Sequence, residues 1–387
     1  MNALAVLLLA GQASATYLYV ASYSGFVSTL NLTETASGID LDIIAQDNNC
    51  GAIPSWLTLK DDGTLICVDE GWRTWPRGTT AIYSTNDDGS LSLLSSVNDV
   101  LVGSVSTVVY GDDDSHFAIA HYAGSGISAW DIADPSVPSM IQQEIYDLEQ
   151  PGADPVRQEA AHPHEVIKDP TETYILAPDL GADIVRIYSI ASDATLEPVE
   201  PLEVPAGSGP RHAAFAVIDD ATYLYIVNEL ANTILAYTVT YTESGMSFDE
   251  IYHSSIYGED GQVPDGVTSA EILVTPDQKN VILSSRMDKS FEIPAFDGDG
   301  SVTSDTLANF AIDQSTGVPE LLQTVPAGGM QPRQFSTNAE GSLVTVGLQG
   351  DGRVVVIERD VETGMLGDFV AWLDVGGEIM CVVWNEL

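Results

Sequence analysis

Short apolar runs recur along the whole chain, separated by turns rich in glycine, asparagine and aspartate. No segment has a long apolar period of 3.6 residues, whereas alternation with a period of two is common. Seven runs are rich in β-branched and aromatic residues, as is typical of strands; they start at Tyr17, Leu65, Phe117, Tyr174, Leu224, Val281 and Leu343. The pattern therefore predicts an all-β protein.

The seven runs belong to a longer repeat. Each is followed by a turn and another strand-like run, and all but the first are preceded by a further run that ends in a turn. The units start roughly fifty residues apart, a spacing that fits one four-stranded blade each. Seven such units predict a seven-bladed β-propeller around a central channel. Two separate sandwich domains are the alternative, but no linker or change in composition marks a boundary between them.

The first unit lacks its inner run, because little chain precedes Tyr17. Segment 372–387 at the other end of the chain contains strand-like runs without a blade of their own. We expect this segment to pair with the N-terminal strand and complete one blade. Such closure would cover the open edge of the N-terminal strand, which could otherwise pair with another chain.

Polar residues from distant units are predicted to meet at one mouth of the channel. In an antiparallel hairpin the start of the first strand lies beside the end of the second. When the units are aligned on their inner turns, the first-strand positions are Trp56, Ser106, His164, Arg211, Glu271 and Arg333. The second-strand positions are Tyr23, Glu70, Tyr122, Asp179, Glu229, Arg286 and Gln349.

The charge balance makes the arginines at this mouth notable. The chain has 57 acidic residues, only 13 lysines and arginines, and a formal net charge of −44. Guanidinium groups suit carboxylates, and histidine exchanges protons near neutral pH, so the cluster predicts a site for a small anionic molecule. The structural alternative is that Arg211 pairs with Glu229, and Arg286 with Glu271, as ties that hold the mouth open.

The same charge argues against several partners. Nucleic acids and anionic membranes both attract basic surfaces, so we expect neither as a partner. No CxxC pair, GxSxG elbow, EF-hand loop or phosphate-binding loop occurs, and we expect no cofactor and no metal.

The N-terminal residues predict export. Residues 1–15 contain a short apolar run and end in Ala13-Ser14-Ala15, as in a cleaved signal peptide, which leaves a single propeller domain over 16–387. A buried first strand is the alternative. The sequon at Asn31 fits a secreted glycoprotein. The three cysteines, Cys50, Cys67 and Cys381, allow one disulfide with one free thiol, or no disulfide.

Four motifs resemble a known family: HPHEV from His162, GPRH from Gly209, NEL from Asn228 and SSR from Ser284. They resemble the seven-bladed β-propeller lactonases, which include propeller-type 6-phosphogluconolactonases and the fungal 3-carboxy-cis,cis-muconate lactonising enzyme, or carboxymuconate cyclase. The resemblance implies a metal-independent site in the channel. It also implies four catalytic residues on the matching motifs, namely His164, Arg211, Glu229 and Arg286. We expect five further residues to bind substrate: Glu70, Glu271, Arg333, Gln349 and Asp179.

The expected activity is lactone chemistry, either closure of a di- or tricarboxylic acid, as by a cycloisomerase, or hydrolysis of a lactone. Arg211 and Arg286 would bind carboxylate or oxyanion charge. His164 and Glu229 would share the proton transfers, with the choice of acid and base left open. Export favours an extracellular sugar-acid lactone over a muconate or a phosphorylated lactone. The alternatives are a secreted, non-catalytic propeller that binds carbohydrate or serves as a surface antigen, and a calcium-dependent lactonase of another propeller family.

Overall fold

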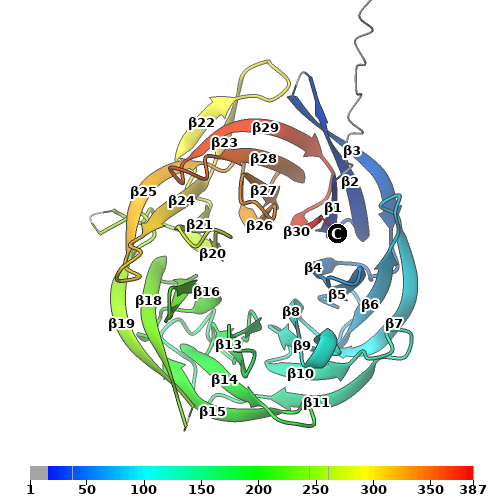
Figure 1. The fold of residues 1–387 in the computed structure, drawn as a ribbon, viewed down its shortest axis with the longest axis vertical. Helices are drawn as coiled ribbons and strands as arrows, with labels where there is room; N and C mark the ends of the chain where they lie inside the picture. The colour runs from blue at the N-terminus through cyan, green and yellow to red at the C-terminus, as the bar shows by residue number, and fades with distance from the viewer. Residues whose placement is uncertain (1–15, 37, 244, 260, 387) are drawn as a thin grey trace, which may run out of the picture.

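Seven four-stranded antiparallel sheets stand around a central axis in the computed structural model (Figure 1). The structure describes residues 16–386 except 37, 244 and 260, so the predicted signal peptide lies outside the described residues. Within these residues the only helical segment is the 3-10 turn η1 (Asp112–Asp114), and no helix is long and apolar enough to cross a membrane. The predicted seven-bladed, all-β propeller is confirmed.

Six of the sheets are built from strands that follow one another in the chain, from the channel outward. The first three consist of β4 (Pro54–Leu59), β5 (Thr64–Asp69), β6 (Arg77–Thr85) and β7 (Leu91–Leu101); β8 (Ser104–Tyr110), β9 (His116–His121), β10 (Gly126–Asp131) and β11 (Ser139–Ile145); and β12 (Ile167–Lys168), β13 (Tyr174–Asp179), β14 (Ile184–Ile190) and β15 (Leu196–Glu203).

The next three consist of β16 (Pro210–Ile218), β17 (Ala221–Asn228), β18 (Thr233–Thr242) and β19 (Gly245–Ser255); β20 (Thr268–Val274), β21 (Asn280–Arg286), β24 (Thr306–Ile312) and β25 (Pro319–Pro326); and β26 (Pro332–Thr337), β27 (Leu343–Leu348), β28 (Arg353–Arg359) and β29 (Leu366–Asp374). A hairpin of β22 (Phe291–Pro294) and β23 (Ser301–Ser304) is inserted between β21 and β24.

The seventh sheet closes the ring with both ends of the chain. Its inner strand is β30 (Ile379–Asn385), which pairs with β1 (Thr16–Ser22), and β2 (Phe26–Thr35) and β3 (Gly38–Asp47) complete the sheet. In this antiparallel pair Ala21 lies opposite Cys381. The predicted closure is therefore confirmed, and the N-terminal strand has a hydrogen-bonded neighbour on both sides.

The core lies between the blades rather than at the centre of the ring. The seven predicted apolar runs form the second strands, and all six residues of β5 are buried. Among the described residues, seven clusters of buried apolar side chains each join two neighbouring sheets. For example, Tyr225 of β17 packs with Leu283 of β21. Burial of such a side chain contributes about 1.5–3 kcal/mol. This arrangement leaves the channel to the polar ends of the inner strands.

The inner hairpins are irregular where they reach the channel mouth. In β16, Pro210 pairs with Asn228 and His212 with Val227, so Arg211 has no residue opposite it. Arg333 occupies the same place in β26, after Pro332. Proline lacks an N–H and is tolerated at such bulges, which turn the extra side chain out of the regular alternation.

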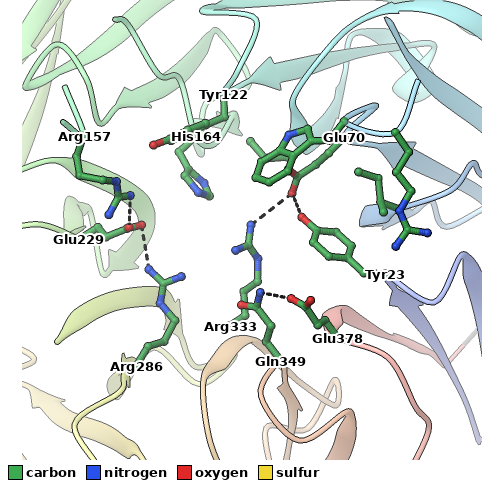
Figure 2. Close-up of a pocket in the computed structure, with 14 residues that line it drawn as sticks. Tyr23, Glu70, Tyr122, Arg157, His164, Glu229, Arg286, Arg333, Gln349 and Glu378 are labelled. Atoms are coloured by element: carbon green, nitrogen blue, oxygen red, sulfur yellow. Dashed lines mark hydrogen bonds and ion pairs between the residues drawn. The ribbon is translucent and has the colours of Figure 1, made fainter. Parts of the chain in front are cut away.

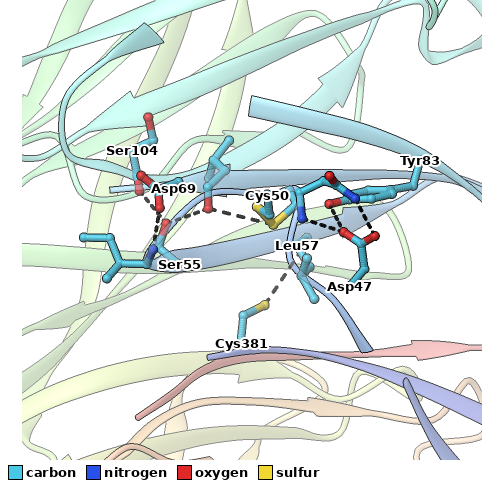
Figure 3. Close-up of a disulfide and its surroundings, with 12 residues drawn as sticks. Asp47, Cys50, Ser55, Leu57, Asp69, Tyr83, Ser104 and Cys381 are labelled. Atoms are coloured by element: carbon cyan, nitrogen blue, oxygen red, sulfur yellow. Dashed lines mark hydrogen bonds between the residues drawn. A yellow bond between two sulfur atoms is a disulfide. The ribbon is translucent and has the colours of Figure 1, made fainter. Parts of the chain in front are cut away.

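A disulfide joins the closing blade to the next one (Figure 3). Cys50 follows β3, and its partner Cys67 lies in the buried strand β5. Cys381 is a free, buried thiol 3.9 Å from the carbonyl oxygen of Leu57. Of the two arrangements that the cysteine count allows, the structure has one disulfide and one free thiol.

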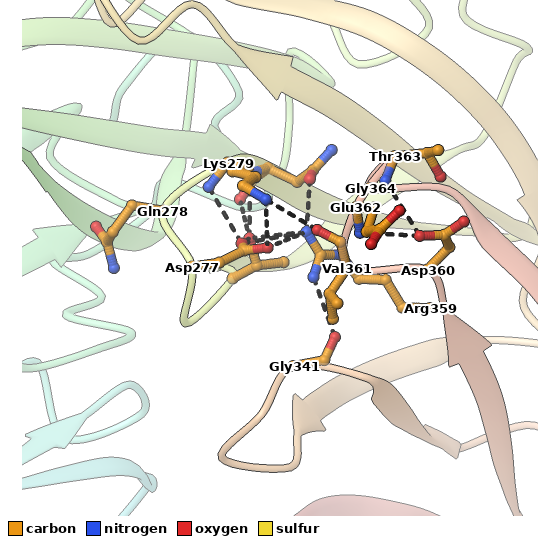
Figure 4. A network of polar contacts seen from close by, with 12 residues as sticks. Asp277, Gln278, Lys279, Gly341, Arg359, Asp360, Val361, Glu362, Thr363 and Gly364 are labelled. Carbon is orange, nitrogen blue, oxygen red and sulfur yellow. Dashed lines mark hydrogen bonds and ion pairs between the residues drawn. The ribbon is translucent and has the colours of Figure 1, made fainter.

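A buried arginine ties two neighbouring blades together (Figure 4). The side chain of Arg359 in β28 has no exposed surface, and its Nη2 donates to Asn280 Oδ1 at 2.7 Å and lies 3.0 Å from Asp277 Oδ2. Its Nη1 donates to the carbonyl oxygen of Gly341. Both terminal nitrogens of Arg359 thus form hydrogen bonds across the interface between the β20–β25 sheet and the β26–β29 sheet.

Candidate functional site

A cavity of about 540 Å³ opens at one mouth of the channel (Figure 2). Its walls come from all seven blades, and mainly from the ends of second strands and the loops that follow them. The lining residues are Tyr23, Ile53, Glu70, Trp72, Arg73, Val105, Tyr122, Arg157, His164, Glu229, Arg286, Arg333, Gln349 and Glu378. The cavity therefore contains several ionisable groups in a chain with few cations.

Glu229 is the centre of one group of charges. It follows β17, and its carboxylate is held between Arg157 and Arg286, which both line the cavity (Figure 2). Arg157 Nη2 donates to Glu229 Oε1 at 2.5 Å, and Arg286 Nη2 lies 3.0 Å from Oε2. Arg211 Nε forms a third ion pair with Oε2 at 3.0 Å. One carboxylate is thus shared by three guanidinium groups.

These charges fix the ionisation of Glu229. Burial alone would raise the pKa of its carboxyl group, but Arg286, Arg211 and Arg157 outweigh burial and lower the pKa to about 2. Burial and the neighbouring arginines lower the pKa of Arg211 to about 9, so it stays charged at neutral pH. Near pH 7, Glu229 is a permanent carboxylate.

His164 lies just before β12, the inner strand of its blade, and its ring points toward the middle of the cavity (Figure 2). The side chain is buried, and the ring edge packs against Tyr122 with centroids 5.4 Å apart. Burial, followed by the positive charges of Arg211 and other neighbours, holds the pKa of His164 well below 6.5. Its imidazole is therefore neutral at pH 7 and able to accept a proton.

Behind His164 a chain of hydrogen bonds leads into the protein. His164 Nδ1 lies 3.2 Å from His212 Nε2, and His212 Nδ1 lies 2.8 Å from Glu271 Oε1. Burial lowers the pKa of His212 to about 4 despite the adjacent carboxylate of Glu271, so this imidazole is also neutral. A neutral His212 has one N–H, and the carboxylate attracts it to Nδ1.

A second carboxyl group, that of Glu165, completes this buried cluster. Glu165 Oε2 accepts a hydrogen bond from the backbone N–H of Ala213 at 2.6 Å, and Oε1 lies 3.6 Å from His212 Nδ1. Burial, and then repulsion by Glu271, raises the pKa of Glu165 well above 4.5. Glu165 therefore holds its proton more tightly than an ordinary glutamate, because a second negative charge beside Glu271 in this buried place is unfavourable.

The cluster of Glu165, His212 and Glu271 is also the one group of described residues with the spacing of a metal site. Their potential ligand atoms lie within 4.8 Å of one another. Glu271 Oε2 has no hydrogen-bond partner among the described residues, whereas Oε1 accepts from both His212 and the N–H of Ile272. A cation or a shared proton would satisfy this set of oxygens.

A second polar group lines the other side of the cavity (Figure 2). The hydroxyl of Tyr23 donates to Glu70, and Arg333 Nη2 lies 3.7 Å from the same carboxylate. Gln349 Nε2 donates to Glu378 Oε2 at 2.7 Å. Burial raises the pKa of Glu70, although the Arg333 charge opposes this. This side offers carboxylate, amide and hydroxyl groups, and its two arginines, Arg333 and Arg73, are matched by the carboxylates of Glu70 and Glu378.

The structure separates the predicted residues into two layers. Six of the nine line the cavity: Glu70, His164, Glu229, Arg286, Arg333 and Gln349. Arg211 and Glu271 lie behind it, Arg211 against Glu229 and the carbonyl oxygen of Ala270, and Glu271 against His212. The predicted structural pair of Arg286 with Glu271 is wrong, because Arg286 binds Glu229 instead.

Asp179 does not lie in the cavity wall. Its Oδ1 accepts hydrogen bonds from the backbone N–H groups of His162, Gly181 and Ala182, and Oδ2 pairs with Arg186 at 2.8 Å. The expectation that Asp179 binds substrate is therefore corrected. Its side chain is fully buried and holds the loop that carries His164.

Several residues of the site were not predicted. Arg157 lies in the long loop between β11 and β12, and Glu378 lies just before β30, so neither belongs to the repeat used for the alignment. Trp72 and Arg73 come from the loop after β5. Glu165 directly follows the HPH motif, and this adjacency was the one available signal.

Most of the chain matches one protein family. Residues 9–384 match the family described as "Lactonase, 7-bladed beta-propeller". A "Probable 6-phosphogluconolactonase" of Arthroderma benhamiae is 30% identical over 92% of this chain and 86% of its own length. A "6-phosphogluconolactonase" of Bacillus subtilis is 26% identical over 81% of this chain and 82% of its own.

Solved structures agree with the fold. The periplasmic gluconolactonase of Pseudomonas aeruginosa superposes with a TM-score of 0.78 at 21% identity, covering 96% of this chain and 99% of that one. A putative 6-phosphogluconolactonase of Bacteroides fragilis superposes with a TM-score of 0.79 at 21% identity, covering 96% and 98%. At this level of identity the likeness concerns the propeller itself.

Proposed function

The chain belongs to the family of seven-bladed β-propeller lactonases, and on this premise we propose that it hydrolyses a small sugar-acid lactone in the channel cavity. The relatives named 6-phosphogluconolactonases support this reaction class. The observation that carries the proposal is a neutral, buried imidazole that lines the same cavity as a carboxylate held by three arginines. This arrangement supplies both a base and positive charge for an oxyanion.

The buried hydrogen-bond chain sets the tautomer of His164. Glu271 draws the proton of His212 to Nδ1, which leaves the lone pair of Nε2 facing His164. His164 then donates its own Nδ1–H to His212, and its Nε2 carries a lone pair toward the cavity. A histidine in this state is ready to take a proton from water.

The proposed reaction has two steps. A water molecule gives a proton to Nε2 of His164 while its oxygen attacks the lactone carbonyl carbon, and the carbonyl electrons move to oxygen beside Arg286. The tetrahedral intermediate then expels the ring oxygen, which takes the proton back from His164. The product is the open hydroxy acid, which ionises and releases one proton to solution at neutral pH.

Glu229 has a different role in this proposal. With a pKa of about 2 it cannot donate a proton at neutral pH, so its carboxylate holds Arg286 and Arg157 in place and can accept a hydrogen bond from the attacking water. Arg211 acts through Glu229, because it is buried behind that carboxylate. The sequence left the roles of His164 and Glu229 open. In this proposal His164 is the base, and Glu229 holds the arginines in position.

Proton release provides the test, with δ-gluconolactone as substrate in a pH-stat at pH 6.5, corrected for spontaneous hydrolysis. His164→Gln should lower kcat by roughly 10²–10⁴ while the thermal unfolding temperature is maintained. His253→Gln is the matched control, since His253 is exposed on β19, away from the cavity. Equal turnover by the folded His164→Gln variant and wild type would remove the proposed base.

Cyclisation of a carboxymuconate is the finer alternative within lactone chemistry. An absorbance assay on 3-carboxy-cis,cis-muconate separates it from hydrolysis, because ring closure removes a conjugated diene without releasing an acid. If the protein turns over none of these substrates, the alternative of a non-catalytic binding protein is favoured. The proposal includes export, and the Cys50–Cys67 disulfide supports it because structural disulfides persist mainly in oxidising compartments.

A further inference from the structure

We propose that the half of the cavity lined by Tyr23, Glu70, Trp72, Gln349 and Glu378 is a subsite for a neutral sugar ring. The substrate class would then be a glycosylated aldonolactone, in which a pyranose is attached to the sugar acid that carries the lactone. This inference rests on the proposed function, because it places the reacting lactone beside His164. We call these five residues the glycosyl subsite.

The size of the cavity exceeds the needs of a single lactone. Gluconolactone has about a dozen non-hydrogen atoms. Even if each took the ~30 Å³ of a water molecule in the liquid, together they would fill about 360 Å³. The cavity measures about 540 Å³. When the lactone lies against His164, space for part of a second ring remains, and its other part reaches the open mouth.

The polar groups of the glycosyl subsite suit hydroxyls. Sugar hydroxyls donate and accept, and Glu70, Glu378 and Gln349 present carboxylate and amide oxygens with lone pairs beyond their present hydrogen bonds. The opposite wall, at Arg157 and Arg286, presents cations around Glu229. The cavity thus has one wall suited to a forming acid and one suited to a polyol.

An aromatic side chain at the rim supports the same ligand. Trp72 lines the cavity yet is 58% exposed, which is unusual for a large apolar side chain. The face of an indole is electronegative, and the C–H bonds on one face of a pyranose carry partial positive charge, so the two can stack. The position of Trp72 at the cavity mouth is where the outer ring of such a substrate would emerge.

The charges argue against a phosphate as the second group. The lining contains four arginines and three glutamates, a formal balance of +1, which matches the single carboxylate of the product. A phosphate adds up to two further negative charges, and on the polyol side it would find no excess of positive charge, because Glu70 and Glu378 balance Arg73 and Arg333. The glycosyl subsite therefore favours a neutral extension over a 6-phosphate.

The test compares kcat/KM for four lactones in the pH-stat: gluconolactone, 6-phosphogluconolactone, cellobionolactone and maltobionolactone. We expect at least one disaccharide lactone to exceed gluconolactone by about tenfold. Trp72→Ala should raise KM for that disaccharide lactone about threefold to tenfold, with kcat and the gluconolactone KM unchanged. Trp75→Ala is the matched control, because Trp75 is 64% exposed in the same loop and does not line the cavity.

Binding of the disaccharide acids, cellobionate and maltobionate, by calorimetry gives a readout without turnover. Weaker binding by Trp72→Ala but not by Trp75→Ala supports the subsite even if no lactone is hydrolysed, an outcome that would refute only the proposed function. Equal kcat/KM for gluconolactone and both disaccharide lactones, with no effect of Trp72→Ala, would overturn the subsite and leave lactone hydrolysis standing. A clear preference for 6-phosphogluconolactone would also overturn it.

Discussion

Replacing Glu271 by glutamine should slow the proposed reaction although Glu271 does not touch the cavity. The change removes the negative charge that accepts the Nδ1–H of His212, 2.8 Å away, at the end of the chain that leads to His164. A glutamine can present its NH2 group to His212 instead of its oxygen. His212 would then carry its proton on Nε2, and His164 would lose the partner that fixes its tautomer.

The size of the effect follows from the hydrogen bond that is lost. A hydrogen bond to a charged group contributes about 1.5–3 kcal/mol. If this interaction is made fully only when His164 takes a proton, kcat should fall roughly 10- to 100-fold, at about 1.4 kcal/mol per tenfold. KM for gluconolactone should change little, because the substrate does not meet Glu271.

The pH profile separates this role from simple structural damage. The pKa of His164 lies well below 6.5, so wild-type kcat/KM should be level near neutral pH and fall only as the acid side protonates His164. Removing a nearby anion disfavours the protonated imidazoles and lowers their pKa. The acid limb of Glu271→Gln should therefore shift to lower pH, measured as initial rates from pH 4 to 7.

Glu165→Gln is the matched control, because it changes a buried carboxyl group of the same cluster. Burial and the charge of Glu271 raise the pKa of Glu165 and favour its neutral form, which glutamine mimics, and the amide oxygen can still accept from the N–H of Ala213. Its kcat and acid limb should stay close to wild type. Equal rates and profiles for the two variants, both folded by thermal unfolding, would refute the proposed role of Glu271.

Three further predictions concern stability and metal dependence. Replacing Cys50 and Cys67 by serine should lower the free energy of unfolding by about 3 kcal/mol in denaturant titrations, since the disulfide closes a loop with a sequence separation of 17 residues; an unchanged midpoint would contradict this. Arg359→Met should cost about 3 kcal/mol because it leaves Asp277 without its buried partner. Burial would raise the pKa of Asp277, but hydrogen bonds from Thr275 and Arg359 lower it. The stability that the ion pair of Asp277 and Arg359 contributes is therefore present above the unfolded carboxyl pKa and is lost as the pH falls below about 4. Wild type should show this loss of stability, and Arg359→Met should not. Prolonged treatment with EDTA should leave turnover unchanged if a shared proton occupies the Glu165, His212 and Glu271 cluster, whereas loss of activity restored by a divalent cation would assign that cluster to a metal.

The propeller could be predicted because the sequence pattern that specifies each blade is local and is repeated along the chain. Every blade needs a second strand that is buried on both faces, and this requirement produces the same apolar run about every fifty residues, as in β5 and β27. Ring closure followed from the missing inner strand before Tyr17, which pairs with Asn385 of β30. Strands that bury alternate side chains show a two-residue alternation of apolar and polar residues, which can be recognised in a single sequence.

The site was predicted as a set of positions but not as a set of contacts. His164, Glu229 and Arg286 reach the cavity because hairpin geometry places strand ends at the mouth. Glu271 stands at an equivalent position in the repeat, but a two-residue irregularity between Ser269 and Ile272 lies there, and its side chain meets His212 instead. Arg157 comes from a loop with no counterpart in the repeat.

The sequence by itself determined the number of blades, the order of their strands and the residues that end near the channel, because these depend on short-range alternation. Only the tertiary structure decided which of those side chains line the cavity and which lie behind it. That choice depends on bulges, on long loops and on which arginines reach a given carboxylate. Such contacts join residues far apart in the chain, and their energies are set by burial and distance, which no local pattern records.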